Sequence, residues 1–162
     1  CLMLHPSKLP KFRGGSPIQN QIIRGYKITY VTIFRMNQHL DSGNILLSKK
    51  ISLEGEMKDI LKRIEQSGIK LTFKILNKKI KEKPQDHSKA TYYNRLVNNS
   101  EITMKELKNS DSRYLYNKIR MLGDPYPNAY IKTSDGKKLL IKTVKIKLSW
   151  LYGQKNIQDT SF

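Results

Sequence analysis

Apolar and polar positions recur with two different periods along the 162-residue chain. Residues 28–36 (ITYVTIFRM) alternate with a period of two and are rich in β-branched and aromatic side chains, which predicts a strand. Residues 45–53 predict a second strand after a short loop. The opening residues 1–4 are all apolar, which is typical of the end of a buried strand. These segments supply the strands of a predicted α/β fold.

Helical periodicity follows the second strand. Apolar side chains in residues 56–76 recur at intervals of three and four, which predicts a long helix with one buried stripe. Gly68 interrupts this helix at a cost of about 1 kcal/mol relative to alanine, which indicates close packing there. The stripe consists of Met57, Ile60, Leu61, Ile64, Leu71 and Ile75.

Two shorter helices and a hairpin complete the predicted elements. Ser16 can cap a helix that begins at Pro17, because proline fits the first helical position. Asp111 can cap a second helix over 111–122. Residues 128–133 and 138–148 predict a β-hairpin.

Composition limits the class of protein. Hydrophobic residues make up 38% and charged residues 27%, which is typical of a globular chain and not of a disordered one. No run of eighteen apolar residues occurs, so the sequence predicts no membrane span. The single cysteine cannot form an internal disulfide, which favours a reducing compartment such as the cytoplasm. The three histidines lie far apart, so no metal site is predicted.

The net charge of +18 is consistent with a nucleic-acid partner, but its distribution weakens that interpretation. Lysines recur along nearly the whole chain and are interleaved with isoleucine and asparagine. The densest stretch, residues 70–83, is either a solvated helix face with its exit loop or a phosphate-attracting patch. Since the chain opens at Cys1 inside an apolar run, we also expect a truncated product or fragment.

The segment with the most chemical information is residues 5–19, HPSKLPKFRGGSPIQ. A histidine at the end of a strand lies where open α/β sheets place their ligands. The loop after it can hold a bend close to a substrate and offer a fork of donors to a phosphate or carboxylate. The side chains and backbone positions predicted to contact the substrate are Ser7, Arg13, Gly14 and Gly15.

The ordered pattern His-x-Ser-x-Leu-Pro-x-x-Arg-Gly-x-x-Pro-Ile/Leu-Gln resembles the signature of the formyltetrahydrofolate-dependent formyltransferase family. That family includes methionyl-tRNA formyltransferase and the sugar N-formyltransferases. Residues 40–43 resemble the family's Leu-Asp-Thr/Ala-Gly segment, and Asp41 follows His5 by 36 positions, as in the family. Residues 119–139 resemble the element that opens the family's C-terminal domain, so the resemblance extends to about residue 147.

The resemblance implies a partial Rossmann-like formyltransferase domain followed by a small subdomain of one helix and a β-hairpin. The implied divisions are the C-terminal part of the catalytic domain (1–85), a linker (86–110), the small subdomain (111–150) and a flexible tail (151–162).

The resemblance also implies residue roles. His5 would transfer a proton and polarise the tetrahedral intermediate, and Asp41 would be its electrostatic partner. The formyl donor 10-formyltetrahydrofolate would lie against the backbone of the loop that contains Met36, Asn37, Leu40 and Asp41. The family usually has an asparagine two residues before the histidine, but this chain has Met3, which cannot donate a hydrogen bond. Loss of such a donor costs about 10²–10³ in rate.

Three functions follow from the resemblance. The preferred one is formyl transfer to the amino sugar of a nucleotide-linked sugar, because the loop has the Arg-Gly-Gly-Ser-Pro form and the chain ends soon after the hairpin. The second is methionyl-tRNA formyltransferase, which would use the positive charge on an RNA backbone. The third is an inactive, truncated relative, as Met3 suggests. A homodimer is possible, and the isolated fragment is expected to be inactive.

Overall fold

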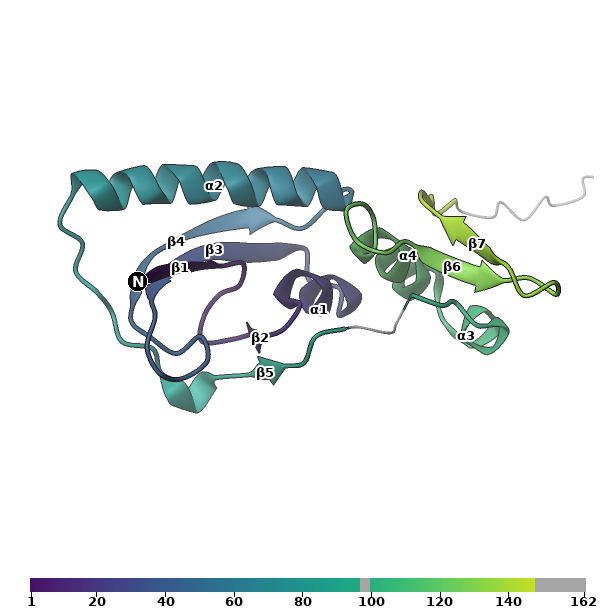
Figure 1. The fold of residues 1–162 in the computed structure, drawn as a ribbon, viewed down its shortest axis with the longest axis horizontal. Helices are drawn as coiled ribbons and strands as arrows, with labels where there is room; N and C mark the ends of the chain where they lie inside the picture. The colour runs from purple at the N-terminus through teal and green to yellow at the C-terminus, as the bar shows by residue number, and fades with distance from the viewer. Residues whose placement is uncertain (97–99, 148–162) are drawn as a thin grey trace, which may run out of the picture.

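A computed structural model describes residues 1–96 and 100–147 (Figure 1). Its largest sheet has the order β1-β3-β4, with both pairs antiparallel. The strands are β1 (Leu2–His5), β3 (Ile28–Arg35) and β4 (Ile45–Ser52). The period of two therefore located β3 and β4 to within one residue at each end, as expected for strands with one buried face.

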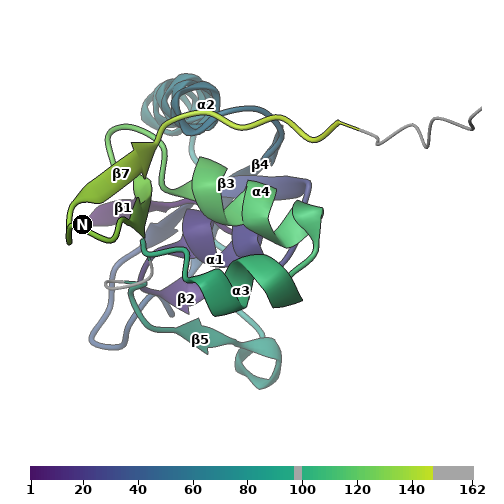
Figure 2. The ribbon, with the colours of Figure 1, turned by 90° about the vertical axis from the view of Figure 1, so that its right-hand side faces the viewer.

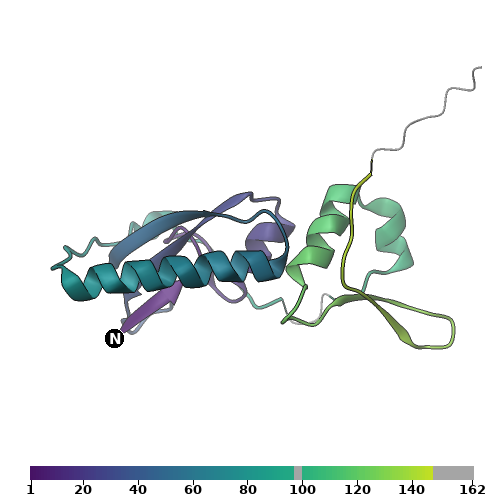
Figure 3. The same cartoon turned by 90° about the horizontal axis from the view of Figure 1, so that it is seen from above.

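Helix α2 (Met57–Asn77) covers one face of this sheet (Figures 1 and 3). Its Leu71 packs into a buried cluster with Val31 and Ile33 of β3 and with Ile51 of β4. A Cβ atom on Gly68 would lie 2.5 Å from the Cδ1 atom of Leu4, so the glycine allows the helix to approach β1. The predicted helix and its predicted point of close packing are both confirmed.

A second buried cluster joins α1 (Pro17–Ile23) and the start of α2 to α4 (Ser112–Met121). Ile22, Ile60 and Met121 are completely buried within it. Burial of a large aliphatic side chain contributes about 1.5–3 kcal/mol. This cluster therefore packs α1, near the start of the chain, against α4, which lies about 90 residues later.

The cap of α1 differs from the prediction. Ser16 has a left-handed backbone (φ 48°) and its side chain caps no helical N–H group. Its hydroxyl instead accepts a hydrogen bond from the backbone N–H of Leu96, at 3.3 Å. The Ser16 hydroxyl is therefore used in a tertiary contact with Leu96. A prediction from the neighbouring residues alone could not include this contact.

The C-terminal elements lie together at one end of the molecule (Figures 1 and 3), the end that faces the viewer in Figure 2. Residues 86–110, predicted as a linker, include η1 (His87–Lys89), β5 (Tyr92–Tyr93) and α3 (Met104–Asn109). Helix α4 begins as predicted, because the Asp111 side chain accepts a hydrogen bond from the N–H of Tyr114 at 2.7 Å. The predicted hairpin is formed by β6 (Ala129–Lys132) and β7 (Lys138–Ile141), but its second strand is shorter than the predicted 138–148. The predicted tail, 151–162, lies outside the described residues.

The apolar opening of the chain is not buried, contrary to the prediction. Leu2, Met3 and Leu4 are 43%, 38% and 39% exposed. Strand β1 lies at the edge of the described sheet, so it has a neighbouring strand on one side. An apolar run indicates a tendency to be buried, but an edge strand with a neighbour on one side leaves part of such a run exposed.

Two kinds of feature are absent from residues 1–96 and 100–147. No helix in these ranges has the length and apolar character needed to cross a membrane. No three His, Cys, Asp or Glu side chains in these ranges gather into a group that could hold a metal ion.

Candidate functional site

The structure brings together the two side chains that were predicted to act as a pair. His5 is the last residue of β1, and Asp41 lies in the loop between β3 and β4. The His5 Nδ1 atom lies 3.6 Å from the Asp41 Oδ2 atom. Both residues are buried, with exposed fractions of 5% and 8%. Burial lowers the local dielectric constant and strengthens the interaction of a protonated imidazole with this carboxylate.

A backbone carbonyl fixes the orientation of the imidazole. The His5 Nε2 atom lies 2.8 Å from the carbonyl oxygen of Phe12. A carbonyl oxygen only accepts hydrogen bonds, so Nε2 carries the hydrogen. In the neutral ring the free lone pair is therefore on Nδ1, facing Asp41. A proton taken up at Nδ1 would form an imidazolium beside the carboxylate.

The Asp41 carboxylate is held from the other side by Gly14. The backbone N–H of Gly14 donates to the Oδ2 atom of Asp41 at 2.8 Å. This is the same oxygen that faces His5. Two interactions thus converge on one oxygen and fix the carboxylate relative to the ring.

The Gly14-Gly15 pair allows strand β2 (Arg13–Gly14) to pair closely with β5. Gly14 has a φ of 91°, and a Cβ atom on it would lie 2.5 Å from the carbonyl oxygen of Tyr93. A Cβ atom on Gly15 would lie equally close to the backbone nitrogen of Arg95. The predicted bend is present, and it brings the residue 91–95 segment against the loop after His5.

Ser7 and Arg13 were predicted to contact a substrate, but the structure places both inside the protein. Ser7 is completely buried, and its hydroxyl donates to the carbonyl of Lys11 at 2.6 Å. Arg13 is 1% exposed, and its guanidinium donates to the Gln85 side chain and to the Tyr92 hydroxyl. Since internal partners occupy these donors, the two side chains organise the loop and do not face an open surface.

The two members of the His5–Asp41 pair line two different hollows. His5 lines a hollow of about 520 Å³, together with Gly15, Arg95 and Tyr126. Asp41 lines a second hollow of about 330 Å³. This second hollow is also lined by Met3 and by the other three residues predicted to hold the folate, Met36, Asn37 and Leu40. The pair therefore has one member on each hollow, an arrangement that suits a group transfer between two bound molecules.

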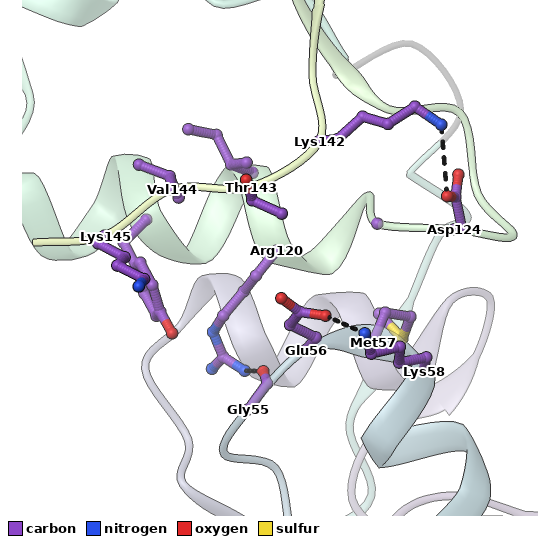
Figure 4. A pocket seen from close by; sticks show the side chains of 13 residues that line it. Gly55, Glu56, Met57, Lys58, Arg120, Asp124, Lys142, Thr143, Val144 and Lys145 are labelled. Carbon is purple, nitrogen blue, oxygen red and sulfur yellow. Dashed lines mark hydrogen bonds and ion pairs between the residues drawn. The ribbon is translucent and has the colours of Figure 1, made fainter.

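A third hollow, of about 380 Å³, lies apart from the predicted site residues (Figure 4). It is formed where the start of α2 meets α4 and residues 142–145. Several of its charged side chains have partners: Lys142 lies 3.5 Å from Asp124, and Arg120 donates to the carbonyl of Gly55. Burial lowers the pKa of Arg120. These contacts indicate a structural junction and supply no group poised for chemistry.

The sequence did not reveal three residues that organise the site. They are Phe12, whose carbonyl orients His5, and Gln85 and Tyr92, which bind the Arg13 guanidinium. Gln85 and Tyr92 follow Arg13 by 72 and 79 positions. Tyr92 lies in the distinctive segment 90–95 (ATYYNR), but no local pattern in the sequence indicates that Gln85 or Tyr92 binds Arg13.

Comparison with known proteins finds that this chain is similar to formyltransferases. The family model described as "Formyl transferase" matches residues 1–80. The chain is 37% identical over 133 residues to a methionyl-tRNA formyltransferase of Kosmotoga olearia, covering 78% of this chain and 42% of that protein. The chain thus spans less than half the length of this curated relative.

Solved structures have the same fold. A methionyl-tRNA formyltransferase from Clostridium thermocellum matches with a TM-score of 0.76 at 29% identity, over 87% of this chain and 66% of that one. A 4-N formyltransferase from Francisella tularensis matches with the same TM-score at 24% identity, over 91% of this chain and 63% of that one. The α/β fold and the family resemblance predicted from the sequence are both confirmed, and residues 1–80 belong to the formyl transferase family.

Proposed function

We propose that the chain takes part in the transfer of a formyl group from 10-formyltetrahydrofolate to a primary amine, with His5 and Asp41 as the reacting pair. One observation carries this proposal. The buried imidazole and carboxylate lie 3.6 Å apart, and each lines a different hollow. A transfer reaction needs such a meeting point between donor and acceptor.

The chemistry follows from the orientation of His5. The amine must be neutral when it attacks, and it becomes positively charged as its nitrogen bonds to the formyl carbon. The free lone pair on Nδ1 takes the proton that the nitrogen then loses. Asp41 stabilises the resulting imidazolium. Collapse of the tetrahedral intermediate breaks the bond to the folate nitrogen, and the imidazolium returns the proton to that leaving group.

The hollow beside Asp41 is the proposed donor site. Met36 and Leu40 on its rim are 45% and 60% exposed, so they offer apolar surface to a flat heterocycle. The loop backbone supplies hydrogen-bonding groups for the ring edge. The larger hollow beside His5 is then left for the amine, with Arg95 and Tyr126 on its wall.

Two amines are candidates. Methionyl-tRNA is supported by the name of the relative at 37% identity and by the net charge of +18, which attracts an RNA backbone. A nucleotide-linked amino sugar is supported by the loop sequence Arg13-Gly-Gly-Ser-Pro17 and by the structural match to a 4-N formyltransferase. We propose the tRNA substrate first, because the sequence similarity behind it is greater.

The test is a formyl-transfer assay with 10-formyltetrahydrofolate and either methionyl-tRNA or a nucleotide-linked 4-amino sugar. It is run on this chain and on the longest translated product that contains it. His5→Ala and Asp41→Ala should each abolish transfer while the far-UV circular dichroism spectrum stays unchanged. Asp135→Ala, in the turn between β6 and β7, serves as the control and should keep full activity. Full activity in either site variant would refute the assignment.

A further inference from the structure

We propose that Arg13 and Gln85 are positioning residues that hold Asp41 in place against His5. This inference rests on the proposed function, in which Asp41 acts on His5. It assigns Arg13 a different role from the one expected from the sequence, because the buried guanidinium donates two hydrogen bonds to Gln85.

The first step is the contact between the two side chains. The Gln85 Oε1 atom accepts hydrogen bonds from Nε of Arg13 at 3.2 Å and from Nη2 at 2.6 Å. Arg13 also donates to the Tyr92 hydroxyl at 2.7 Å, and its Nη2 atom lies 3.2 Å from Nδ1 of His87. Among the residues that the structure describes, these partners are neutral side chains. A buried cation held by neutral dipoles is costly unless its geometry is well satisfied, which favours a single fixed arrangement.

The second step is the contact between Gln85 and the Asp41 loop. The Nε2 atom of Gln85 donates to the carbonyl of Asp41 at 3.0 Å and to the carbonyl of Gly43 at 2.7 Å. Gln85 is 6% exposed, so its whole amide is used inside the protein. Arg13 orients the Gln85 amide by donating to the amide oxygen. The amide nitrogen of Gln85 then donates to the carbonyls on both sides of Ser42.

The backbone conformation of Asp41 requires such support. Asp41 has a φ of 48°, in the left-handed region that non-glycine residues rarely occupy. A residue in this conformation persists only when its surroundings fix it. Gln85 fixes its carbonyl, and the backbone N–H of Gly14 fixes its carboxylate. Gly14 follows Arg13 directly. This dipeptide therefore fixes the Asp41 carboxylate through Gly14 and the Asp41 carbonyl through Arg13 and Gln85.

Two substitutions of Gln85 separate positioning from simple packing. Gln85→Glu keeps an oxygen acceptor for Arg13 but removes the two N–H donors to the Asp41 loop. Gln85→Leu removes both functions. If the glutamine serves only as a partner for Arg13, the Glu variant should behave as wild type. If Gln85 positions Asp41, the Glu and Leu variants should both change the Gly14 amide exchange and the rate of formyl transfer.

The control for loss of a buried cation is Lys118→Met, compared with Arg13→Met. Both cations are 1% exposed. Lys118 donates to the carbonyl of Glu101 and to the carboxylate of Glu106, away from the His5–Asp41 pair. Both variants should lower global stability, but only Arg13→Met should disturb Asp41.

The readout that does not need activity is amide hydrogen exchange in the full chain. The exchange rate of the Gly14 amide, which donates to Asp41, is measured relative to that of Val31 in the core of β3. We expect this ratio to rise at least tenfold in Gln85→Glu, Gln85→Leu and Arg13→Met. It should stay unchanged in Lys118→Met.

The kinetic readout is the formyl-transfer assay, in which kcat should fall at least tenfold in Gln85→Glu while KM for the formyl donor stays within twofold. A wild-type Gly14 exchange ratio and a wild-type kcat in Gln85→Glu would overturn the positioning role. If neither this chain nor the longest translated product that contains it transfers a formyl group, the proposed function fails, and the exchange ratio alone then decides whether Arg13 and Gln85 hold Asp41.

Discussion

Gly14→Ala tests whether the close pairing of β2 and β5 is what fixes the site. Gly14 has a φ of 91°, and an added Cβ atom would lie 2.5 Å from the backbone carbonyl oxygen of Tyr93. A backbone atom cannot move aside as the tip of a side chain can. The substitution must therefore open the pairing between the two strands.

The expected cost has two parts. A positive φ costs an L-residue about 1–2 kcal/mol. Opening the pair weakens two hydrogen bonds of 2.8 Å, from the Arg13 N–H to the Thr91 carbonyl and from the Gly15 N–H to the Tyr93 carbonyl. At about 0.5–1.5 kcal/mol each, these add about 1–3 kcal/mol. The total for Gly14→Ala is then about 2–5 kcal/mol, the sum of these ranges.

Gly25→Ala is the matched control. Gly25 also has a positive φ, of 78°, but an added Cβ atom would have no atom within 4 Å. Its cost should be the strain alone, about 1–2 kcal/mol. Urea unfolding followed by circular dichroism gives both values. Equal losses of unfolding free energy in the two variants, within about 0.5 kcal/mol, would show that the contact with Tyr93 carries no penalty and would refute the reasoning.

Three other expectations follow from the structure. Met3→Asn should raise the formyl-transfer rate, because Met3 lies two residues before His5 on the same face of β1 and lines the donor hollow; an unchanged rate would show that no donor is missing there. Gly68→Ala should raise the unfolding free energy by up to about 1 kcal/mol, because the atom it approaches is the movable tip of Leu4; a loss in thermal or urea unfolding would count against this. Hydrogen bonds from Lys89, the larger cause, and from Ser88 lower the pKa of Asp86 from 3.8 to about 2, so the stability they contribute is present above pH 4 and is lost as the pH falls towards 2. In Lys89→Met, carboxyl chemical shifts should show that the pKa of Asp86 rises towards 3.8, and an unchanged value would exclude Lys89 as the cause.

The sequence predicted the elements whose stability is decided locally. Strand β3 and helix α2 each have a regular apolar face, and each has the expected bounds to within one or two residues. Asp111 caps α4 as predicted, because a cap needs only the next few residues. Helix α3 was not predicted, because its six residues bury no side chain and so carry no apolar period.

The contacts that complete the site could not be predicted in the same way. The residues His5 and Asp41 were found from a sequence pattern, but the residues that orient them were not. Arg13 seemed free to bind a substrate because its partner Gln85 lies 72 positions away in a segment without periodicity. Likewise, the hydroxyl of Ser16 binds the backbone of Leu96, 80 positions away. Such contacts depend on tertiary structure and leave no short-range signal.

The register of β1 shows why Asp41 needs support to reach His5. Strand β1 runs antiparallel to β3, with Leu2 opposite Arg35 and His5 opposite Thr32. The loop that carries Asp41 leaves β3 beside Leu2, three residues from His5, which is about 10 Å along the strand. The loop must therefore fold back along the sheet, and the left-handed φ of Asp41 is part of that return. A shift of one residue in this register would turn His5 to the opposite face of the sheet, so the pairing of β1 with β3 and the clamp on Asp41 are both required for the pair to form.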